Sequence, residues 1–247
     1  MSSADTALEF YSERQRIATA CRIMAMEGIV EGTLGHISMR MGDDLMLIRS
    51  RGPVDSGLFF ATPEEICLFD FSGNPREADR GFTKPVELPL HGETLRSRAD
   101  ANVVVHAHPP AVLAATLANL DLVPAFGSFN IPANQIAMEG IPIYPRSILI
   151  SSREIALDML ATMGDHRACV LRGHGITVVG TTLESALLSA LNVNTLAQVA
   201  LEIAKTGLRA VPIPEEDQAL VPKVSKFSPD AGWKFYEAKL RRYGFDK

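Results

Sequence analysis

The chain has 247 residues, of which 47% are hydrophobic and 21% are charged, and its formal net charge is −5. This balance is typical of a soluble globular protein with enough residues for a large core. The sequence contains no basic run or basic-aromatic stripe, and no uninterrupted apolar run approaches the ~18 residues of a membrane span. We therefore expect neither a nucleic-acid partner nor a membrane partner.

The N-terminal part is predicted to begin as a helix and to continue as short strands. Apolar residues at helical spacing predict a helix near residues 6–28, and Gly28 is suited to end it. A glycine-rich turn then leads into an alternating strand that reaches Arg40, and further strands are expected at 45–48 and 66–70. These strands are short and joined by turns, which favours antiparallel pairing.

The rest of the chain is predicted to interleave helices with single strands. The expected helices cover 86–98, 110–118, 152–162, 181–205 and 229–242. The expected strands cover 103–108, 141–143, 168–171 and 176–179. A loop and the helix at 152–162 separate the strand at 141–143 from the strand at 168–171, and the rest of 123–145 is predicted as a proline-rich loop. Thr181 and Glu184 have the spacing of a capping box. No clear linker interrupts the pattern before 212–214, so we expect one mixed α/β domain over 1–247 with a helical C-terminal tail at about 212–247.

The cysteines and the N-terminus predict the compartment. Cys21, Cys67 and Cys169 are odd in number, far apart and without a CxxC pair, as is typical of buried apolar residues in a reducing environment. Residues 1–5 lack the basic segment that precedes the apolar run of a signal peptide. We therefore expect a cytoplasmic protein.

Two histidines one residue apart are the most informative feature of the sequence. His106 and His108 end a β-branched run that begins at Val103, and prolines follow them. Residues i and i+2 of a strand share one face, so both imidazoles leave the strand end on the same side. Such a pair chelates a divalent metal once one or two more ligands join it. Two polar residues on a sheet rim would show the same pattern, so the pair alone leaves both interpretations open.

Three more residues are candidates for the same site. Glu87 precedes His106 by 19 residues, near the start of a predicted helix, and His91 follows Glu87 by four positions on the same helical face. His174 lies between two glycines at a strand junction, where the backbone is free and the side chain is uncrowded. Each of these residues is also compatible with an ordinary structural role. His106, His108, His174 and Glu87 together offer three nitrogens and one oxygen, a set that Zn prefers and that Mn, Fe, Co and Ni tolerate.

These motifs, in this order, resemble the class II aldolase/adducin family. Members of that family carry an acidic residue at a helix start, an HxH motif farther on, a third histidine in a His-Gly pair and a Gly-x-x-Ser-x-Arg motif, found here at 35–40. The resemblance spans roughly residues 8–207. It implies a three-layer α/β/α sandwich with a mainly antiparallel central sheet, and a homotetramer with active sites between subunits. The tail residues Trp233, Tyr236 and Tyr243 are candidates to cross the subunit boundary.

The chain departs from the sugar-phosphate aldolases of this family where those enzymes bind phosphate. Their paired serines before the glutamate are replaced by Pro85 and Val86, which offer no hydroxyl. The usual asparagine of the glycine-rich motif is His36, and a Thr-Gly pair is replaced by Arg51 and a glycine. The proton-donating tyrosine of the fuculose-phosphate aldolase type should fall within 126–129, which contains no tyrosine. The resemblance therefore argues against phosphate binding and aldol cleavage.

The replacements suit an aromatic acid that carries two carboxylates. Arg49 and Arg51 are two residues apart on an extended segment, where they could share a face or be ordinary loop charges, and a guanidinium binds a carboxylate with two hydrogen bonds. Phe126 and Phe129 could flank a flat ring or belong to the core. The candidate substrate-binding residues are Arg51, His36, Ser50 and Phe129. The combination resembles the branch of the family that decarboxylates hydroxylated aromatic dicarboxylates, such as dihydroxyphthalate or hydroxy-methylpyridine-dicarboxylate.

We therefore expect a metal-dependent decarboxylase that works by a retro-aldol-like mechanism on a small carboxylate substrate. It would use one divalent ion per subunit, Zn or Mn first and Fe or Co next, to take up the charge left when CO2 departs. Glu87 is the candidate acid/base, and His91 is expected to orient Glu87 or the substrate. One alternative is an aldolase or epimerase acting on a small hydroxy acid or sugar phosphate. Another is a non-catalytic adducin-like scaffold, against which the complete ligand set argues.

Overall fold

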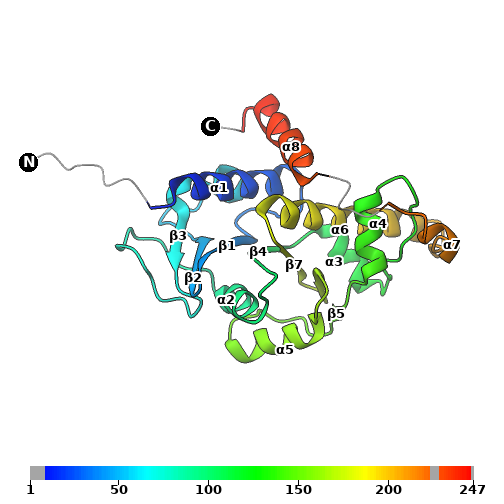
Figure 1. The fold of residues 1–247 in the computed structure, drawn as a ribbon, viewed down its shortest axis with the longest axis horizontal. Coiled ribbons are helices and arrows are strands. Elements are labelled where there is room, and N and C mark those ends of the chain that lie inside the picture. Colours follow the sequence, from blue (N-terminus) through cyan, green and yellow to red (C-terminus); the bar gives the residue numbers. More distant parts are fainter. Residues whose placement is uncertain (1–8, 223–227, 246–247) are drawn as a thin grey trace, which may run out of the picture.

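A seven-stranded sheet organises the chain (Figure 1). The computed structural model describes residues 9–222 and 228–245, so the expected lack of a signal sequence in residues 1–5 lies outside the described residues. The strands are β1 (His36–Gly42), β2 (Leu45–Arg49), β3 (Ile66–Phe69), β4 (Val103–Ala107), β5 (Ile143–Tyr144), β6 (Ala168–Leu171) and β7 (Gly175–Gly180). Their order is β3-β2-β1-β4-β7-β6-β5, and every neighbouring pair except β5 and β6 is antiparallel. The predicted mainly antiparallel sheet is therefore confirmed.

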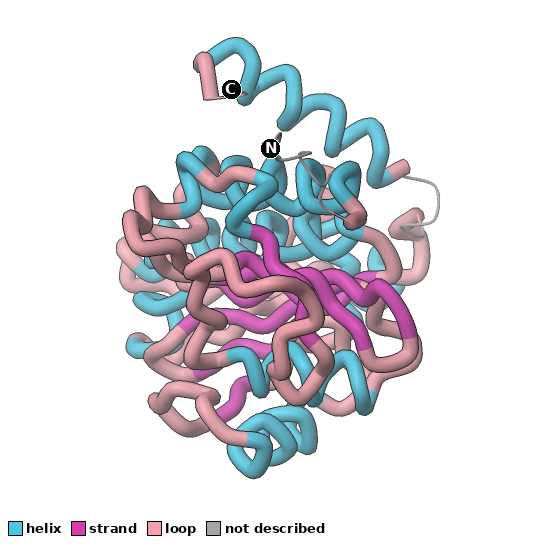
Figure 2. The backbone as a smooth tube through the Cα atoms, turned by 90° about the vertical axis from the view of Figure 1, so that its left-hand side faces the viewer, coloured by secondary structure: helices cyan, strands magenta, loops and turns pink. Residues whose placement is uncertain are grey.

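Helices cover both faces of the sheet and complete three layers (Figure 2). One layer contains α1 (Tyr11–Met26), α3 (Pro110–Leu117) and α6 (Leu183–Ala204), and the other contains α2 (Leu88–Ser97) and α5 (Arg153–Met163). Figure 1 shows α1 and α6 above the sheet and α2 and α5 below it. Two short 3-10 turns, Leu58–Phe60 and Pro63–Glu65, precede β3. The predicted α/β/α sandwich agrees with this arrangement.

The central strand β4 is buried on both faces. Val103 and Val105 belong to the apolar cluster under α1 and α6, whereas Val104 belongs to the cluster against α2 and α5. A strand covered on both faces reads as a continuous apolar run, which explains the β-branched segment in the sequence. His106 shares the face of Val104, so β4 turns His106 toward the layer that contains α2.

The segment 123–145, predicted mostly as loop, contains the helix α4 (Ile131–Glu139), which packs on α6. The side-chain oxygen of Asn130 accepts the N–H of Ala133 and caps this helix. Pro132 stands in the first turn, where no backbone N–H is needed, and Gly140 ends the helix with a φ of 92°. The capping residues were present in the sequence, but the proline-rich surroundings hide so short a helix. β5 begins two residues later than the predicted 141–143 strand.

The long helix α6 runs through the centre of its layer. By length and composition alone it could cross a membrane, but half of its apolar 18-residue window is buried inside the fold. It contacts α1, α3, α4 and the strands β4, β6 and β7, as the core helix of a globular domain does. Its capping box joins Thr182 to Ser185, not Thr181 to Glu184, because the helix begins after Thr182, whose backbone is extended at φ −133° and ψ 161°. The Glu184 carboxylate pairs with Arg16 of α1.

The C-terminal segment adds the one-turn helix α7 (Glu215–Gln218) and the helix α8 (Pro229–Tyr243). α8 packs on α1 and α6, where Trp233 and Leu240 are buried, and Lys239 Nζ lies 2.6 Å from Glu27 Oε1. Trp233, expected as a candidate subunit contact, is therefore used inside its own subunit. Tyr243 is exposed.

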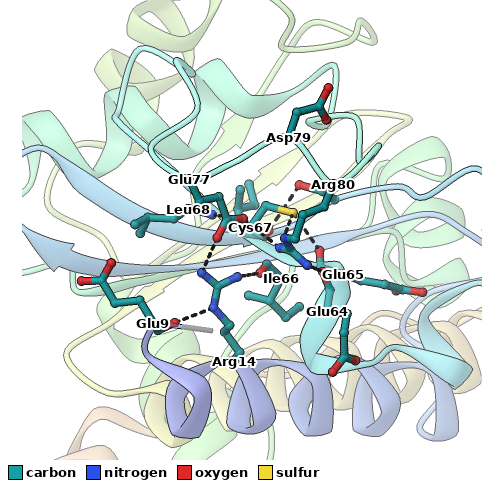
Figure 3. Close-up of polar contacts among 12 residues, drawn as sticks. Glu9, Arg14, Glu64, Glu65, Ile66, Cys67, Leu68, Glu77, Asp79 and Arg80 are labelled. Atoms are coloured by element: carbon teal, nitrogen blue, oxygen red, sulfur yellow. Dashed lines mark hydrogen bonds and ion pairs between the residues drawn. The ribbon is translucent and has the colours of Figure 1, made fainter. Parts of the chain in front are cut away.

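A buried arginine ties α1 to the edge strand β3 (Figure 3). Arg14 is fully buried and donates to the carbonyl oxygens of Glu9 and Ile66 and to the carboxylate of Glu77, which lies 2.6 Å away. Arg80 pairs with the same carboxylate at 2.8 Å. Burial alone would raise the pKa of Glu77, but the hydrogen bonds from Arg14 and Arg80 hold it below its usual value. The loop after β3 is thereby fixed against α1.

Candidate metal centre

The end of β4 carries the first two candidate ligands. His106 is fully buried and pairs across the sheet with His36 of β1 and Thr177 of β7. His108 follows the strand by one residue and is half-buried. The Nε2 atoms of the two histidines lie 2.8 Å apart, so both imidazoles leave the strand end on the same side, as their spacing predicts.

His174 approaches this pair from the turn between β6 and β7. Its ring centre lies 5.0 Å from that of His106 and 4.8 Å from that of His108. A Cβ on Gly175 would lie 2.2 Å from the carbonyl oxygen of Ala107, which is far too close. Glycine at this position therefore lets β7 run close beside the end of β4, and this closeness brings His174 to the other two rings.

Glu87 completes the cluster from the residue that precedes α2. Its buried carboxylate places Oε2 at 3.2 Å from His106 Nε2 and Oε1 at 3.5 Å from His174 Nε2. The backbone N–H of Ile150 donates to Oε1 at 2.9 Å and helps to hold the side chain in place. This amide comes from the segment before α5, and no motif in the sequence indicates it.

The protonation of the cluster suits a divalent cation. Burial alone would raise the pKa of Glu87, but the neighbouring His106 and His174 imidazoles hold it well below its usual range, so the carboxylate is ionised. Burial, followed by the repulsion that a protonated His108 would meet from a protonated His106, lowers the pKa of His108 to about 3, so this imidazole is neutral near neutral pH. Metal ions bind ionised carboxylates and neutral imidazoles.

Hydrogen bonding also turns free lone pairs toward the centre. The Nδ1–H of His106 donates to the carbonyl oxygen of Ile176 at 3.0 Å, which leaves Nε2 as the bare nitrogen. Neither ring nitrogen of His174 has a hydrogen-bond partner among the described residues. One donor atom from each of Glu87, His106, His108 and His174 lies within 4.8 Å of the others. The four residues therefore fit one divalent metal ion with nitrogen and oxygen ligands.

The structure gives His91 a different partner from the expected one. Its Nδ1 lies 2.7 Å from the Oγ of Ser38 on β1, whereas no hydrogen bond joins it to Glu87 in the described part of the chain. The four-residue spacing does not bring Glu87 and His91 together on one helical face, because Glu87 precedes the helix and has φ −90° and ψ 21°. His91 is fully buried, and burial, followed by the repulsion that a protonated His91 would meet from a protonated His106, lowers its pKa to about 3.

His36 and Arg51, both expected to bind substrate, lie next to the cluster or close to it. The ring of His36 stacks on that of His106 with 6.0 Å between the centres. Burial, then the repulsion that a protonated His36 would meet from protonated His91 and His106, holds the pKa of His36 well below its usual value, so it offers a hydrogen bond and no charge. Arg51 is partly exposed, and its Nε lies 3.6 Å from the Asp55 carboxylate. Its positive charge also helps to lower the pKa of His36.

Ser50 and Arg49 are engaged within the fold. Ser50 follows β2 and is fully buried, and its hydroxyl lies 3.5 Å from the backbone carbonyl oxygen of Ile48. Arg49 is also fully buried and pairs with Asp55 and with Glu65. The two arginines therefore do not share an open face, and the contact of Ser50 with substrate stays a prediction.

Phe126 and Phe129 do not form a slot for a flat ring within this subunit. Their rings meet edge to face, with centres 5.5 Å apart and planes at 88°. Two rings at right angles cannot lie parallel on both sides of a ligand. Phe126 is a core residue packed with Ala133 and Leu196, whereas Phe129 is 76% exposed, and its contact with substrate stays a prediction.

Known proteins place this geometry in a family. The profile described as Class II Aldolase and Adducin N-terminal domain matches residues 15–201. The chain belongs to the class II aldolase/adducin family. It is 43% identical over 231 residues to a 3,4-dihydroxyphthalate decarboxylase of Arthrobacter keyseri, which covers 92% of this chain and 93% of that protein. It is also 43% identical to a 3,4-dihydroxyphthalate decarboxylase of Terrabacter sp., over 94% of this chain and 98% of that protein.

A solved structure supports the class II aldolase fold. The aldolase II superfamily protein from Pseudomonas syringae superposes with a TM-score of 0.81, at 19% sequence identity, over 98% of this chain and 97% of that one. The matched class II aldolase/adducin region contains all four candidate ligands, whereas α7 and α8 lie beyond it. The family and the fold that the sequence motifs predict are thus confirmed.

Proposed function

We propose that this class II aldolase/adducin protein is a metal-dependent decarboxylase of a hydroxylated aromatic dicarboxylate, with 3,4-dihydroxyphthalate as the substrate to test first. The observation that carries the proposal is the convergence of Glu87, His106, His108 and His174 at the end of β4. The 43% identity to two 3,4-dihydroxyphthalate decarboxylases, over more than nine-tenths of the chain, supports the choice of substrate.

Decarboxylation leaves the electron pair of a carbon–carbon bond on the aromatic ring. A divalent ion held by Glu87, His106, His108 and His174 would supply Lewis acidity for the charge that develops as the bond breaks. Glu87 is ionised and held by the Ile150 amide, so it can accept the proton of that hydroxyl. As CO2 leaves, Glu87 returns a proton to the same ring carbon, and solvent restores the hydroxyl proton. The net reaction replaces one carboxylate by hydrogen.

The carboxylate that stays on the ring needs its own partners. Arg51 keeps 43% of its side chain exposed, and its guanidinium can bind a carboxylate with two parallel hydrogen bonds. His36 is neutral, and its Nδ1 has no hydrogen-bond partner among the described residues. We propose that Arg51 supplies the charge and His36 supplies a hydrogen bond, so that a dicarboxylate is preferred to a monocarboxylate.

We further propose a cytoplasmic homotetramer with active sites at subunit boundaries, and Zn or Mn, then Fe or Co, as the bound metal. Two exposed apolar side chains flank Glu87: Val86 is 66% exposed, and Leu149, beside Ile150, is 55% exposed. A neighbouring subunit would bury such side chains and close the site. Light scattering tests the assembly, since a monomer at working concentration contradicts it, and elemental analysis of the purified protein identifies the metal.

A substrate screen tests the proposed reaction. The metal-loaded protein is assayed for CO2 release from 3,4-dihydroxyphthalate and from 2,3-dihydroxybenzoate, which lacks the second carboxylate. The same protein is assayed for aldol cleavage or synthesis with dihydroxyacetone phosphate and short aldehydes. We expect CO2 release, faster with the dicarboxylate. Turnover of the phosphate substrate without any CO2 release would overturn the proposed function.

A further inference from the structure

Ser38 and His91 form a buried hydrogen-bonded pair behind the candidate metal centre. Ser38 lies two residues after His36 on β1, so both side chains face the layer that contains α2. Ser38 and His91 are fully buried, with 2.7 Å between Oγ and Nδ1. The ring of His91 meets that of His36 edge to face at 5.9 Å, and His36 in turn stacks on His106. The pair therefore lies one ring away from the metal ligands.

The available partners decide the direction of this hydrogen bond. If His91 donated from Nδ1, the hydroxyl proton of Ser38 would need another acceptor, and the described residues offer Ser38 Oγ no hydrogen bond except the one with His91. If Ser38 donates to Nδ1, its proton is used and the single remaining N–H of the imidazole lies on Nε2. The first arrangement leaves two buried groups unpaired, the hydroxyl proton and the bare Nε2, whereas the second leaves only the Nε2–H, so the second is favoured. Ser38 is therefore the donor, and His91 carries its proton on Nε2.

The Nε2–H of His91 lacks an acceptor in the described polypeptide. Buried polar groups in folded proteins are nearly always paired, so this donor is available to a group that the polypeptide does not supply. The ring of His36 lies between the rings of His91 and His106, 5.9 Å from the first and 6.0 Å from the second, and His106 is a member of the metal cluster. The acceptor therefore belongs to a molecule bound beside that cluster.

We propose that Ser38 is a positioning residue that fixes His91 as the Nε2–H tautomer, and that His91 donates this hydrogen bond to an oxygen of the bound aromatic acid. The nature of the acceptor rests on the proposed function, whereas the tautomer does not. A donor held in one orientation in a buried site stabilises charge on an oxygen with little reorganisation. Without Ser38, the imidazole divides between its two tautomers, and part of the population loses the donor.

Magic-angle-spinning NMR of zinc-loaded protein labelled with 15N-histidine reads the tautomer directly, because protonated and bare ring nitrogens resonate far apart. The His91 signals are assigned by their loss in His91→Gln. We expect the Nε2–H form in the wild-type protein and a mixture of both forms in Ser38→Ala. A wild-type His91 protonated on Nδ1 overturns the proposal, and this readout needs no variant of Ser38. An unchanged tautomer in Ser38→Ala overturns it as well.

Thr94→Val is the matched control for the loss of a buried hydroxyl. The Thr94 hydroxyl is also fully buried on α2, but it donates to the carbonyl oxygen of Leu90 and has no hydrogen bond with a histidine. We expect the His91 signals of this variant to match the wild-type signals. A tautomer mixture in Thr94→Val as large as that in Ser38→Ala would overturn the specific role of Ser38.

Kinetics test the second half of the proposal. Ser38→Ala is expected to lower kcat about 10-fold with unchanged zinc content and little change in KM. His91→Gln places an amide N–H near the position of Nε2, whereas the amide of His91→Asn reaches only the position of Nδ1, so the glutamine variant should keep more activity. Equal losses in the two variants overturn the donor role of His91. If the tautomer results hold and no form releases CO2, the proposed function fails while the positioning role of Ser38 stands.

Discussion

The Nε2 atoms of His106 and His108 lie 2.8 Å apart, and the Nδ1–H of His106 donates a hydrogen bond to the carbonyl oxygen of Ile176. Nε2 of His106 is therefore bare. A second bare nitrogen at this distance would repel it, so either a proton on His108 or a shared cation must lie between the two rings. Protons and metal ions therefore compete for a chelate whose geometry the strand end already provides.

Replacing either histidine is expected to abolish stoichiometric metal binding. His106→Ala and His108→Ala should retain no metal after dialysis, whereas the wild-type protein retains one divalent ion per subunit. The wild-type melting temperature should also fall on chelation, because a ligand at 100 times its Kd stabilises the folded state by about 2.7 kcal/mol. Elemental analysis and calorimetry with and without a chelator measure both effects.

His166→Gln is the control for this experiment. His166 lies 3.0 Å from the carbonyl oxygen of Met163 through its Nδ1 and is not part of the metal cluster. This variant should therefore keep its metal and its response to the chelator. Full metal content in His106→Ala would show that the ligand set is assigned wrongly.

Arg51→Ala is expected to raise KM for a dicarboxylate at least 10-fold, since a charged hydrogen bond contributes about 1.5–3 kcal/mol. KM for a monocarboxylate such as 2,3-dihydroxybenzoate should change little. Arg51→Lys should recover part of the effect, because lysine keeps the charge and loses the fork. Steady-state kinetics with both substrates measure the difference, and Arg241→Ala, on the distant helix α8, controls for a lost surface charge. Equal changes in KM for the two substrates would remove Arg51 from the carboxylate site.

The candidate ligands could be predicted because each stands at a feature with a local rule. The alternation of a strand places His106 and His108 on one side, and the glycines around His174 mark a turn with a free backbone. By contrast, Ser38 lies 53 residues from His91, and Ile150 lies 63 residues from Glu87. No local rule connects such pairs, and only the folded chain shows them.

Tertiary partners also decide between local alternatives that look equal in the sequence. Thr181 with Glu184 and Thr182 with Ser185 both have the spacing of a capping box. In the fold the extended backbone of Thr182 makes this residue the N-cap, and the Glu184 carboxylate pairs with Arg16, 168 residues away. The sequence likewise gives no partner for Arg49, whereas the structure pairs it with Glu65 and Asp55.

Glu77→Gln is expected to destabilise the protein most at neutral pH. The change leaves the fully buried Arg14 without its carboxylate, and breaking a buried pair costs about 3–5 kcal/mol, here reduced because Glu77 is 18% exposed. The pKa of Glu77 is lowered by its arginine partners, so its contribution is full above the unfolded value of about 4.3 and is lost as the pH falls through the lower folded value. Urea unfolding at neutral and acidic pH measures the difference between variant and wild type.

Asp79→Asn is the matched control, because Asp79 lies on the same loop and is exposed. Its Oδ1 accepts the N–H of Gly81, which an asparagine oxygen can also do. The control should unfold like the wild-type protein at every pH. If the deficit of Glu77→Gln stays constant down to pH values well below 4, the ion pair with Arg14 is not its source.

Gly175→Ala is expected to weaken metal binding although Gly175 is not itself a ligand. The new Cβ would lie 2.2 Å from the carbonyl oxygen of Ala107 and 3.0 Å from a ring carbon of His108, so β7 must move away from the end of β4. Overpacking of this kind costs about 1–3 kcal/mol, and the shift carries His174 away from the other ligands. Calorimetric metal titration and urea unfolding measure both losses. Gly127→Ala, whose Cβ meets nothing within 4 Å, should change neither quantity. A Gly175→Ala protein that binds metal as tightly as wild type would mean that the close contact of β4 and β7 does not set the position of His174.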